Sequence, residues 1–495
     1  MDKDLSRRNF FKATGATAGL AIAAGWSPFS YAQNEKVRVA LIGTGSQNCV
    51  HIEDGLAGAQ EIDIVAIADC LIPNLGKGFN LICGDDEAKK AALKPHLYLD
   101  YHEMLDKEKD NIDAVIIATP FKTHYKIVMD CLDAGKYVFC EKTMAHTYEY
   151  CRNIVTKCHE TGLFVQCGHQ RRYNPEFNRA ATDIIERGRL GRVSYIEAQW
   201  HRNGDWRRPL PLRKDGTAYQ LTEAEQKFIP NFERHMNWRI YEEFSAGLMS
   251  ELATHHLEVT NFLMGTMPTR VHGTGGIDYW RDGRDTYDNV ALTYEYEMNS
   301  RLHGFGPLDA RNAEMQNHMR EINRPYTVRV TWTGTLQSAY KGAYMLVIGD
   351  KGTFQLRERT AADMPGCVFC AEPKKIYLDP KTGQPTEDKA TIEWIRSSGQ
   401  SQKYTRLEDV PPVPFESELG MGIFDKTPDT RQFEAFAKHI KEGGKPRTNE
   451  MVGLMASICD IAGHEAVTEK KTVEIDPALY AFDFETPNPF EYESI

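Results

Sequence analysis

The sequence lacks the clustered positive charge that a nucleic-acid-binding protein needs. Its 495 residues hold 70 Asp and Glu against 59 Lys and Arg, which gives a formal net charge of -11, and they contain no long run of Lys or Arg. Neutralising a phosphate backbone requires clustered cations. We therefore exclude nucleic acid as a partner.

The sequence also has little apolar material near its start. Residues 13–26 form a weakly apolar run that is too short, and too rich in Gly and Thr, to cross roughly 30 Å of hydrocarbon. The run follows Arg7-Arg8 within a twin-arginine export pattern, and Ser30-Tyr31-Ala32 after it fits a cleavage site. We predict a signal peptide at residues 1–32, export by the twin-arginine machinery to the periplasm, and no transmembrane segment in the mature chain.

A disulfide framework is not indicated either. The chain has 11 cysteines, an odd number, and eight lie between Cys49 and Cys167, mostly inside apolar segments. Cysteines in apolar segments usually behave as small buried hydrophobic residues. Cys367 and Cys370 form one close pair, and no second pair stands at the spacing of a metal site. For this pair we favour a surface disulfide or plain thiols.

What the sequence does have is a regular alternation of apolar runs and helical patterns in its first third. Short continuous apolar runs stand at residues 37–43, 62–69, 114–120, 137–142 and 164–168. Between them, apolar residues recur at helical spacing, as in Ile127, Val128, Cys131 and Leu132. This pattern predicts an α/β fold, with a doubly wound parallel sheet of the Rossmann type over residues 33–170.

The remainder of the chain predicts a second domain, over residues 171–480. Alternating apolar and polar residues at 289–296, 326–332 and 344–349 predict strands of an open mixed or antiparallel sheet with one exposed face. A helix is expected over 243–264, and two more near Phe433 and Leu454. Residues 360–425, rich in Pro, Lys, Glu and Gly, predict a surface insertion. Residues 481–495 form a tail.

The first apolar run ends in Gly43-Thr44-Gly45, where a strand meets a helix. The first Gly permits the tight turn, and the second lets the backbone approach a pyrophosphate at the helix N-terminus. The usual third Gly is replaced by Asn48. Asp69 closes the next strand, where an acid accepts hydrogen bonds from ribose hydroxyls and repels a 2′-phosphate. We expect a bound dinucleotide, NAD rather than NADP.

Several further segments, taken in order, resemble one known family. They are Ala118-Thr119-Pro120 followed by His124, Cys140-Glu141-Lys142-Thr143, Gly168-His169-Gln170-Arg171-Arg172-Tyr173, Asn237-Trp238-Arg239 and Glu251-Leu252-Ala253-Thr254-His255-His256. The chain resembles the glucose–fructose oxidoreductase, inositol dehydrogenase and MocA (Gfo/Idh/MocA) family. The resemblance implies a Rossmann domain, a second α/β domain that often mediates oligomerisation, and a catalytic lysine at Lys142. We accordingly expect a homo-oligomer, a dimer or a tetramer. Thr143 stands where the family usually has Pro, and Glu251 where many members have Asp.

The expected cofactor-binding residues combine the turn with the positions that the resemblance implies. They are Gly43, Thr44, Gly45, Ser46, Gln47, Asn48, Asp69, Thr119, Pro120, His124, Glu141 and Lys142. Oxidation of a secondary alcohol needs a base, a group that stabilises the developing alkoxide, and placement of the substrate. We expect His255 to be the base and Lys142 to hold the hydroxyl. Glu251, four residues before His255, would orient the imidazole or bind a neighbouring hydroxyl.

Aromatic and charged residues near the expected site suit a sugar. The candidate substrate-binding residues are Arg171, Arg172, Tyr173, Arg202, Trp206, Trp238 and His256. A metal site at Glu251, His255, His256 and Glu258 is not favoured, because adjacent histidines on a helix point in different directions. We expect no metal.

Together these features predict an NAD-dependent oxidoreductase that converts a secondary hydroxyl of a sugar, glycoside or polyol to a ketone. Free dinucleotide is not expected outside the cytoplasm, so the cofactor would be loaded before export and held tightly. Two alternatives stay open. One is an NAD-dependent glycosidase that works by transient oxidation and elimination. The other is a catalytically silent sugar- or dinucleotide-binding protein. The sugar, the oxidised carbon and the electron acceptor are left open.

Overall fold

The computed structural model describes residues 35–185, 188–213, 215–298, 325–350, 352–357, 367–371, 392–395, 401–404, 413–414, 419 and 424–491. The expected signal peptide, residues 1–32, lies outside these ranges, as does most of the expected insertion at 360–425. None of the helices in the described ranges combines the length and the apolar character needed to cross a bilayer.

The first domain is built on a six-stranded parallel sheet whose strand order is β3-β2-β1-β4-β5-β6, the order of a Rossmann fold. Its strands are β1 (Val37–Ile42), β2 (Ile62–Ala68), β3 (Leu97–Tyr98), β4 (Ala114–Ile117), β5 (Tyr137–Cys140) and β6 (Val165–Cys167). Strands β4, β5 and β6 are buried throughout, because helices cover both faces of the sheet. Five of the strands were predicted, whereas β3 has only two residues and no apolar run to reveal it.

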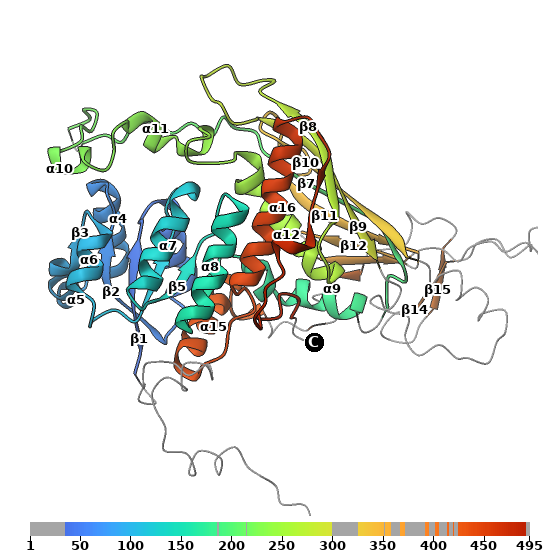
Figure 1. Ribbon diagram of the computed structural model, residues 1–495, viewed down its shortest axis with the longest axis horizontal. Helices are drawn as coiled ribbons and strands as arrows, with labels where there is room; N and C mark the ends of the chain where they lie inside the picture. The colour runs from blue at the N-terminus through green and yellow to red at the C-terminus, as the bar shows by residue number, and fades with distance from the viewer. Residues whose placement is uncertain are drawn as a thin grey trace, which may run out of the picture.

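Helices connect these strands. They are α3 (Ser46–Val50), η1 (His51–Leu56), α4 (Ile72–Cys83), α5 (Glu87–Leu93), η2 (Lys94–His96), α6 (Tyr101–Lys107), η3 (Phe121–Thr123), α7 (His124–Asp133) and α8 (Tyr148–Thr161). A helix from the far end of the chain, α15 (Pro428–Glu442), joins this domain by packing on η1 (Figure 1). Its Phe433 lies within 4.8 Å of Phe139, measured between ring centroids. The C-terminal region therefore completes the core of the first domain.

The second domain has a nine-stranded sheet in the order β16-β13-β12-β11-β7-β10-β9-β8-β17, parallel only between β7 and β10. The strands are β7 (Val193–His201), β8 (Arg270–Gly276), β9 (Asn289–Met298), β10 (Tyr326–Thr335), β11 (Ala343–Gly349), β12 (Gly352–Leu356), β13 (Val368–Ala371), β16 (Val413–Pro414) and β17 (Val473–Glu474). A separate hairpin pairs β14 (Ile392–Ile395) with β15 (Ser401–Tyr404). The expected open mixed sheet is confirmed.

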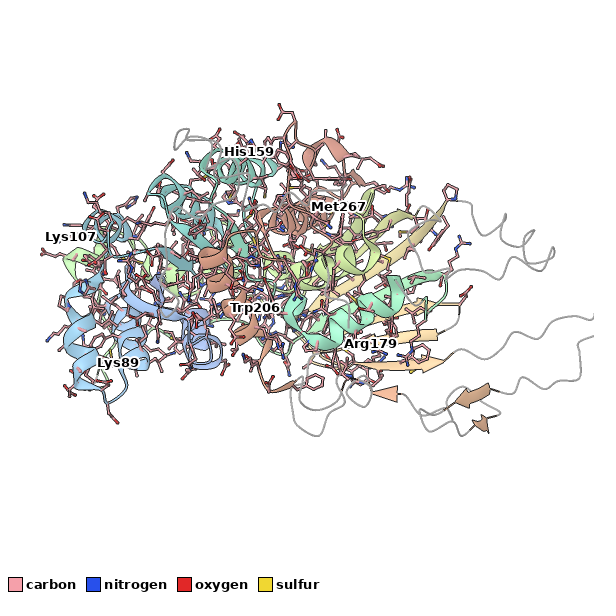
Figure 2. All side chains as sticks on the ribbon, turned by 90° about the horizontal axis from the view of Figure 1, so that it is seen from below. Lys89, Lys107, His159, Arg179, Trp206 and Met267 are labelled. Atoms are coloured by element: carbon pink, nitrogen blue, oxygen red, sulfur yellow. The ribbon has the colours of Figure 1, made fainter. Side chains whose placement is uncertain are left out.

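Helices cover one face of the second sheet. They are η4 (Gln170–Tyr173), α9 (Pro175–Ile185), η6 (Met249–Ala253), α12 (Thr254–Met264), α16 (Glu450–Thr468) and η9 (Pro477–Leu479). Along β9 every second residue is buried, as expected for a sheet with one covered face. The predicted helix over 243–264 is wrong in its first part, since residues 243–247 form turns, and helical backbone begins at 248 with a π-helical turn at Met249–Ala253 before α12. Figures 1 and 2 show the Rossmann domain and the second sheet at opposite ends of the molecule.

One segment of the second domain reaches back over the first. We call residues 202–213 and 215–245 the strap; it carries α10 (Glu223–Gln226), α11 (Phe232–Met236) and η5 (Trp238–Ile240) and passes above α4 and α7 in Figure 1. Two hydrogen bonds fix it there. The backbone N–H of Ile72 donates to Glu225 Oε1 at 2.8 Å, and that of Lys122 donates to the Phe244 carbonyl at 3.0 Å. The strap thus covers the carboxyl ends of the parallel strands.

Candidate active site between the two domains

A cavity of about 630 Å³ lies between the Rossmann domain and the strap. Such a volume is typical of small-molecule and cofactor sites. The Rossmann domain lines it with the turn after β1 and the ends of β2, β4 and β5, the edge where open α/β sheets bind ligands. The lining residues that the sequence predicted are Gly43, Gly45, Ser46, Gln47, Asp69, Thr119, Pro120, His124, Glu141, Lys142, Trp238 and Glu251.

The two glycines of the turn have different physical roles. Gly43 adopts φ +79°, and a Cβ there would lie 2.8 Å from Thr119 Cγ2 and 3.0 Å from the Ala118 carbonyl oxygen. Only glycine fits such a position. A Cβ at Gly45 would meet nothing within 4 Å, although Gly45 lines the cavity. Gly43 is therefore needed for the conformation of the turn itself. Gly45 leaves open space of the kind that a dinucleotide backbone approaches.

Asp69 ties the turn to the end of β2. Its carboxylate accepts hydrogen bonds from the backbone N–H groups of Thr44 at 2.7 Å and Leu71 at 2.8 Å. Burial raises the pKa of Asp69 to about 6, against the effect of these hydrogen bonds. Above that pH the group is an anion at the cavity wall.

Two predicted cofactor residues do not line the cavity. The Thr44 side chain is fully buried and donates to the Asn74 carbonyl at 3.0 Å. Asn48, which stands at the third glycine position, donates from Nδ2 to the Gly43 carbonyl at 2.5 Å. Both side chains hold the turn in shape, so any contact of theirs with a cofactor would be indirect.

Glu141 is the carboxylate at the centre of the Rossmann wall. Its Oε1 lies 2.7 Å from His51 Nε2, and its Oε2 accepts from the Lys142 backbone N–H at 3.0 Å. Burial by itself would raise the pKa of Glu141, but His51 and Lys142 lower it below the ordinary value. Gln47 Nε2 donates to the same carboxylate at 3.4 Å. Sequence reasoning missed His51, whose only signal is its position one helical turn after Gln47.

His124 forms the wall between the Thr119-Pro120 turn and Lys142. Its Nδ1 lies 2.9 Å from the Thr143 carbonyl oxygen, and its Nε2 lies 3.0 Å from that of Thr119. Burial lowers the pKa of His124 against the opposing effect of these two carbonyls. A neutral imidazole has one N–H and so donates to one of them. His124 therefore fixes the turn that faces the cavity.

Lys142 follows β5 and extends from the Rossmann wall toward the second domain. Its Nζ donates to the carbonyls of Ser250 at 3.1 Å and Glu251 at 3.0 Å. An ammonium has three N–H donors, so one is left for a further partner. The two carbonyls hold the ammonium at the domain junction, in the same cavity as Gly45 and Ser46.

Behind Lys142 lies a buried carboxyl that sequence reasoning missed. Thr143 Oγ1 lies 2.8 Å from Asp460 Oδ2 and 3.2 Å from the Ser250 carbonyl oxygen. Burial raises the pKa of Asp460 to about 8, although Thr143 and the charge of Lys142 act to lower it. Asp460 lies on α16, and an acid inside that long apolar helix was the available signal. The hydroxyl at 143 thus links the lysine turn to the C-terminal helix.

His255 lies on α12, next to Lys142 but not in the cavity lining. Its ring is 5.5 Å from that of Trp200 and 6.4 Å from that of His169. Burial lowers the pKa of His255 well below the ordinary value, and the cations Arg171 and Lys142 act in the same direction. The imidazole is therefore neutral near pH 7. Both ring nitrogens of His169 are buried and have no hydrogen-bond partner among the described residues.

Glu251 does not orient His255. Its Oε2 accepts a hydrogen bond from Arg239 Nε at 2.8 Å, and Glu251 lines the cavity. The i, i+4 argument fails because Glu251 lies in the π-helical turn and not in α12. Glu251 instead pairs with Arg239, and both residues line the cavity.

The predicted substrate-binding residues fall into two groups. Trp238 lines the cavity, and the guanidinium carbons of Arg171 and Arg202 lie 5.1 Å and 5.4 Å from the Trp200 ring centroid. Arg171 and Arg202 are absent from the cavity lining, as are the other four residues, Arg172, Tyr173, Trp206 and His256.

Those four side chains take part in packing. Arg172 Nε donates to Glu258 at 2.5 Å, and its guanidinium also donates to carbonyls of the C-terminal tail, whose residues up to 491 are described. His256 Nδ1 accepts from Trp332 Nε1 at 3.2 Å. Tyr173 is buried, and Trp206 packs on the core. Substrate contact by these four is therefore not supported.

The cysteines lie mostly inside the Rossmann domain. Seven of the eight between Cys49 and Cys167 are buried, as predicted. Cys367 is also fully buried, which the interpretation as a surface pair did not predict. In the described ranges no group of three His, Cys, Asp or Glu side chains is placed to hold a metal ion.

Comparison with known proteins gives relatives of the same kind. An uncharacterized oxidoreductase of Streptococcus pneumoniae is 30% identical over 207 residues, covering 41% of this chain and 48% of the relative. An α-N-acetylgalactosaminidase of Shewanella oneidensis is 28% identical over 251 residues, covering 44% and 53%. The chain thus spans about half the length of these curated relatives.

Solved structures share the fold. The WlbA dehydrogenase of Bordetella pertussis, in complex with NADH and UDP-GlcNAcA, aligns with a TM-score of 0.54 at 16% identity, over 89% of this chain and 99% of the other. The aldose–aldose oxidoreductase of Caulobacter crescentus aligns with a TM-score of 0.56 at 19% identity, over 89% and 100%. At these identities the likeness concerns the fold.

Two family profiles account for most of the described chain. Residues 37–169 match the oxidoreductase family with an NAD-binding Rossmann fold, and residues 178–304 match the Gfo/Idh/MocA C-terminal domain. Together they cover more than half of the sequence. With the strand order and the glycine turn described above, they establish that this chain belongs to the Gfo/Idh/MocA family of oxidoreductases.

Proposed function

We propose that this chain is an NAD-dependent oxidoreductase that converts a secondary hydroxyl of a sugar, glycoside or polyol to a ketone. One observation carries the proposal: the Lys142 ammonium lies in the same cavity as the Gly43–Gly45 turn and the Thr119-Pro120 turn. An alcohol bound at Lys142 would therefore share one enclosed volume with a dinucleotide held by the turn.

The cavity walls fit a dinucleotide with two hydroxyls on its adenosine ribose. Gly45 leaves open space, and Asp69 presents a carboxylate that is ionised above a pKa of about 6. These features favour NAD over NADP. The twin-arginine pattern at residues 1–32 supports export to the periplasm with the cofactor already bound and tightly retained. A homo-oligomer formed through the open sheet, and the domain boundaries at 33–170 and 171–480, belong to the same proposal.

The residues of this chain divide the chemistry between them. A nicotinamide ring bound here supplies the acceptor for the hydrogen removed from carbon. Lys142, fixed by the carbonyls of Ser250 and Glu251, donates its remaining N–H to the substrate hydroxyl and stabilises the charge that develops on its oxygen. His255 on α12, which lies outside the cavity lining itself, is the group that we propose as the acceptor of the proton. Trp238 and the Arg239–Glu251 pair, at the cavity wall, bind the ring and its other hydroxyls.

A glycosidase that acts by transient oxidation is the second candidate. Relatives named glycosyl hydrolase family 109 proteins, 28% identical over about half of their length, favour it. Such an enzyme would release a sugar from a glycoside and accumulate no ketone. A silent binding protein, the third candidate, would keep its ligand affinity and show no turnover with Lys142 present or absent.

The test is a panel of glycosides, free sugars and polyols, followed by reduced-nicotinamide absorbance and product mass together. We expect at least one compound of the panel to give a product that is two hydrogens lighter than the compound itself. An equal amount of cofactor, or of an added acceptor, should be reduced. Net bond cleavage without a ketone would favour the glycosidase. No change in any substrate, with nucleotide bound, would favour the binding protein.

A further inference from the structure

The arginines of the strap, and Arg284 of the second domain, differ in whether a carboxylate lies within ion-pair distance of the guanidinium. Arg207 pairs with Glu233 and Asp282, Arg234 with Glu243, Arg239 with Glu251 and Arg284 with Asp282. Arg208 stands apart from these. Within the described residues, no carboxylate lies within ion-pair distance of its guanidinium, although Arg208 lines the cavity.

The Arg208 guanidinium lies against the glycine turn. Its Nη1 donates to Ser46 Oγ at 2.6 Å, and Ser46 directly follows Gly45. Ser46, Gly45 and Arg208 all line the cavity. Arg208 belongs to the second domain and Ser46 to the first, so this contact brings a positive charge from one domain to the cofactor turn of the other.

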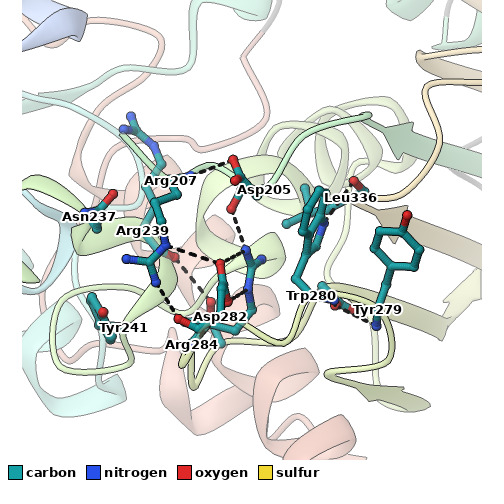
Figure 3. A network of polar contacts seen from close by, with 12 residues as sticks. Asp205, Arg207, Asn237, Arg239, Tyr241, Tyr279, Trp280, Asp282, Arg284 and Leu336 are labelled. Atoms are coloured by element: carbon teal, nitrogen blue, oxygen red, sulfur yellow. Dashed lines mark hydrogen bonds and ion pairs between the residues drawn. The ribbon is translucent and has the colours of Figure 1, made fainter. Parts of the chain in front are cut away.

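The backbone at Arg208 is held firmly, which leaves the side chain to project. Its N–H donates to Asn237 Oδ1 at 2.6 Å, and Asn237 Nδ2 donates to Glu233 Oε1 at 3.1 Å. Arg207 next to it is fixed by Glu233 and by the Asp282 carbonyl at 2.7 Å. Figure 3 shows the group of paired side chains around Arg207, Asp282 and Arg284 that supports this part of the strap. The network thus places one unbalanced cation at the turn.

The residues of the glycine turn carry no positive charge, and the Rossmann lysines Lys122 and Lys126, which also line the cavity, follow the Thr119-Pro120 turn instead. At the turn the Rossmann domain offers Gly43, Gly45, Ser46 and Gln47, and its nearby acids are Asp69 and Glu141. Lys142 already donates to the carbonyls of Ser250 and Glu251, and the proposed function assigns its third N–H to the substrate hydroxyl. A pyrophosphate beside Gly45 would therefore gain a charged partner from the strap, since arginine binds phosphate oxygens through several N–H donors.

We propose that Arg208 binds the pyrophosphate of the dinucleotide and so joins the second domain to the cofactor. The inference rests on the proposed function, because it needs a dinucleotide in this cavity. A pyrophosphate bound beside Ser46 by the other N–H groups of the Arg208 guanidinium would be in contact with both domains. Together with the Ile72–Glu225 hydrogen bond, such a contact would tie the strap to the Rossmann domain while the cofactor is bound.

The test compares Arg208→Met with Arg234→Met, a strap arginine that pairs with Glu243 and is absent from the cavity lining. Full-length mature protein is stripped of nucleotide, and affinities for NAD⁺, NADP⁺, ADP-ribose and adenosine are measured by calorimetry. We expect Arg208→Met to weaken NAD⁺, NADP⁺ and ADP-ribose by about 10- to 100-fold. Adenosine, which has no phosphate, keeps its affinity, and Arg234→Met behaves as wild type.

The outcomes separate the inference from the function beneath it. Equal NAD⁺ affinity in wild type and Arg208→Met overturns the role of Arg208 and leaves the proposed function standing. A loss confined to NADP⁺ overturns it too, since Arg208 would then contact the 2′-phosphate. Failure of the wild type to bind any dinucleotide overturns both. If Arg208→Met is less stable to heat, Arg208→Lys serves instead, and it should recover part of the lost affinity.

Discussion

The two walls of the cavity are built by different means. The Rossmann wall consists of strand ends and a glycine turn, where backbone groups and small residues set the shape. The strap wall consists of larger side chains, aromatic residues such as Phe228 and Trp238 together with two arginines, of which Arg239 is paired with Glu251 and Arg208 has no ion pair among the described residues. The shape of the Rossmann wall therefore follows from short local stretches of sequence. The charge of the strap wall depends on which residues the fold brings together.

The largest effect is expected at Lys142, whose ammonium joins the Rossmann domain to η6 of the second domain. Lys142→Met should lower kcat at least about 1000-fold, because it removes the group that stabilises the developing alkoxide. NAD⁺ affinity should stay within a few-fold of wild type, since the glycine turn and Asp69 are intact. Steady-state kinetics and calorimetry check the two parts.

Lys107→Met is the matched control, because Lys107 is exposed at the outer end of the Rossmann domain and pairs only with Glu103 among the described residues (Figure 2). Its kcat should equal that of wild type. A Lys142→Met enzyme that keeps normal turnover would show that the Lys142 ammonium has no chemical role.

His255 gives the next effect. His255→Asn should lower kcat about 100-fold through loss of the base. Burial keeps the pKa of His255 well below its ordinary value, so in wild type the base stays neutral as the pH falls through 6.5. The kcat profile at saturating NAD⁺ should therefore show no acid limb near 6.5. A limb there that disappears in His255→Asn would contradict the buried, neutral imidazole.

The glycines of the Rossmann wall separate shape from binding. Gly43→Ala places a methyl group 2.8 Å from Thr119 Cγ2 at φ +79°, so it should destabilise the fold by about 1–3 kcal/mol. Gly45→Ala meets no protein atom within 4 Å and should leave the melting temperature unchanged, yet weaken NAD⁺ about 10-fold. Thermal melts and calorimetry on both variants test this. Equal behaviour of the two alanines would refute the division of roles.

The smallest effect concerns Asp460, behind the walls. Its pKa is raised from 3.8 to about 8, so between those values the native state keeps a proton that the unfolded chain has lost. This group therefore makes the free energy of unfolding fall as the pH rises through that range. Asp460→Asn should remove its share, more than about 1 kcal/mol, when urea unfolding at pH 5 and pH 8 is compared with wild type. An unchanged slope would show that the carboxyl is ionised throughout.

The same contrast explains what the sequence allows one to predict. Strands β1, β2, β4, β5 and β6 follow from continuous apolar runs, and Gly43, Asp69 and Lys142 stand at their ends, so their positions are set locally. Arg207 and Arg208 are neighbours of the same type, and only tertiary partners separate them.

The misses have the same cause. Glu251 was assigned to His255 on helical spacing, but a π-helical turn and Arg239 intervene. Arg172 and His256 suit a sugar by residue type, yet Glu258 and Trp332 occupy them in the core. Asp460 contacts Thr143 across 317 residues of sequence, a distance over which no local pattern operates.

The most direct measurement is the mass of whatever small molecule the folded protein releases on denaturation, after purification without added cofactor. Tight retention between the glycine turn and the strap predicts one nicotinamide dinucleotide, NAD, per chain, and a lower content in Arg208→Met than in Arg234→Met. Release of no nicotinamide nucleotide, combined with no binding of added NAD⁺, would contradict the account.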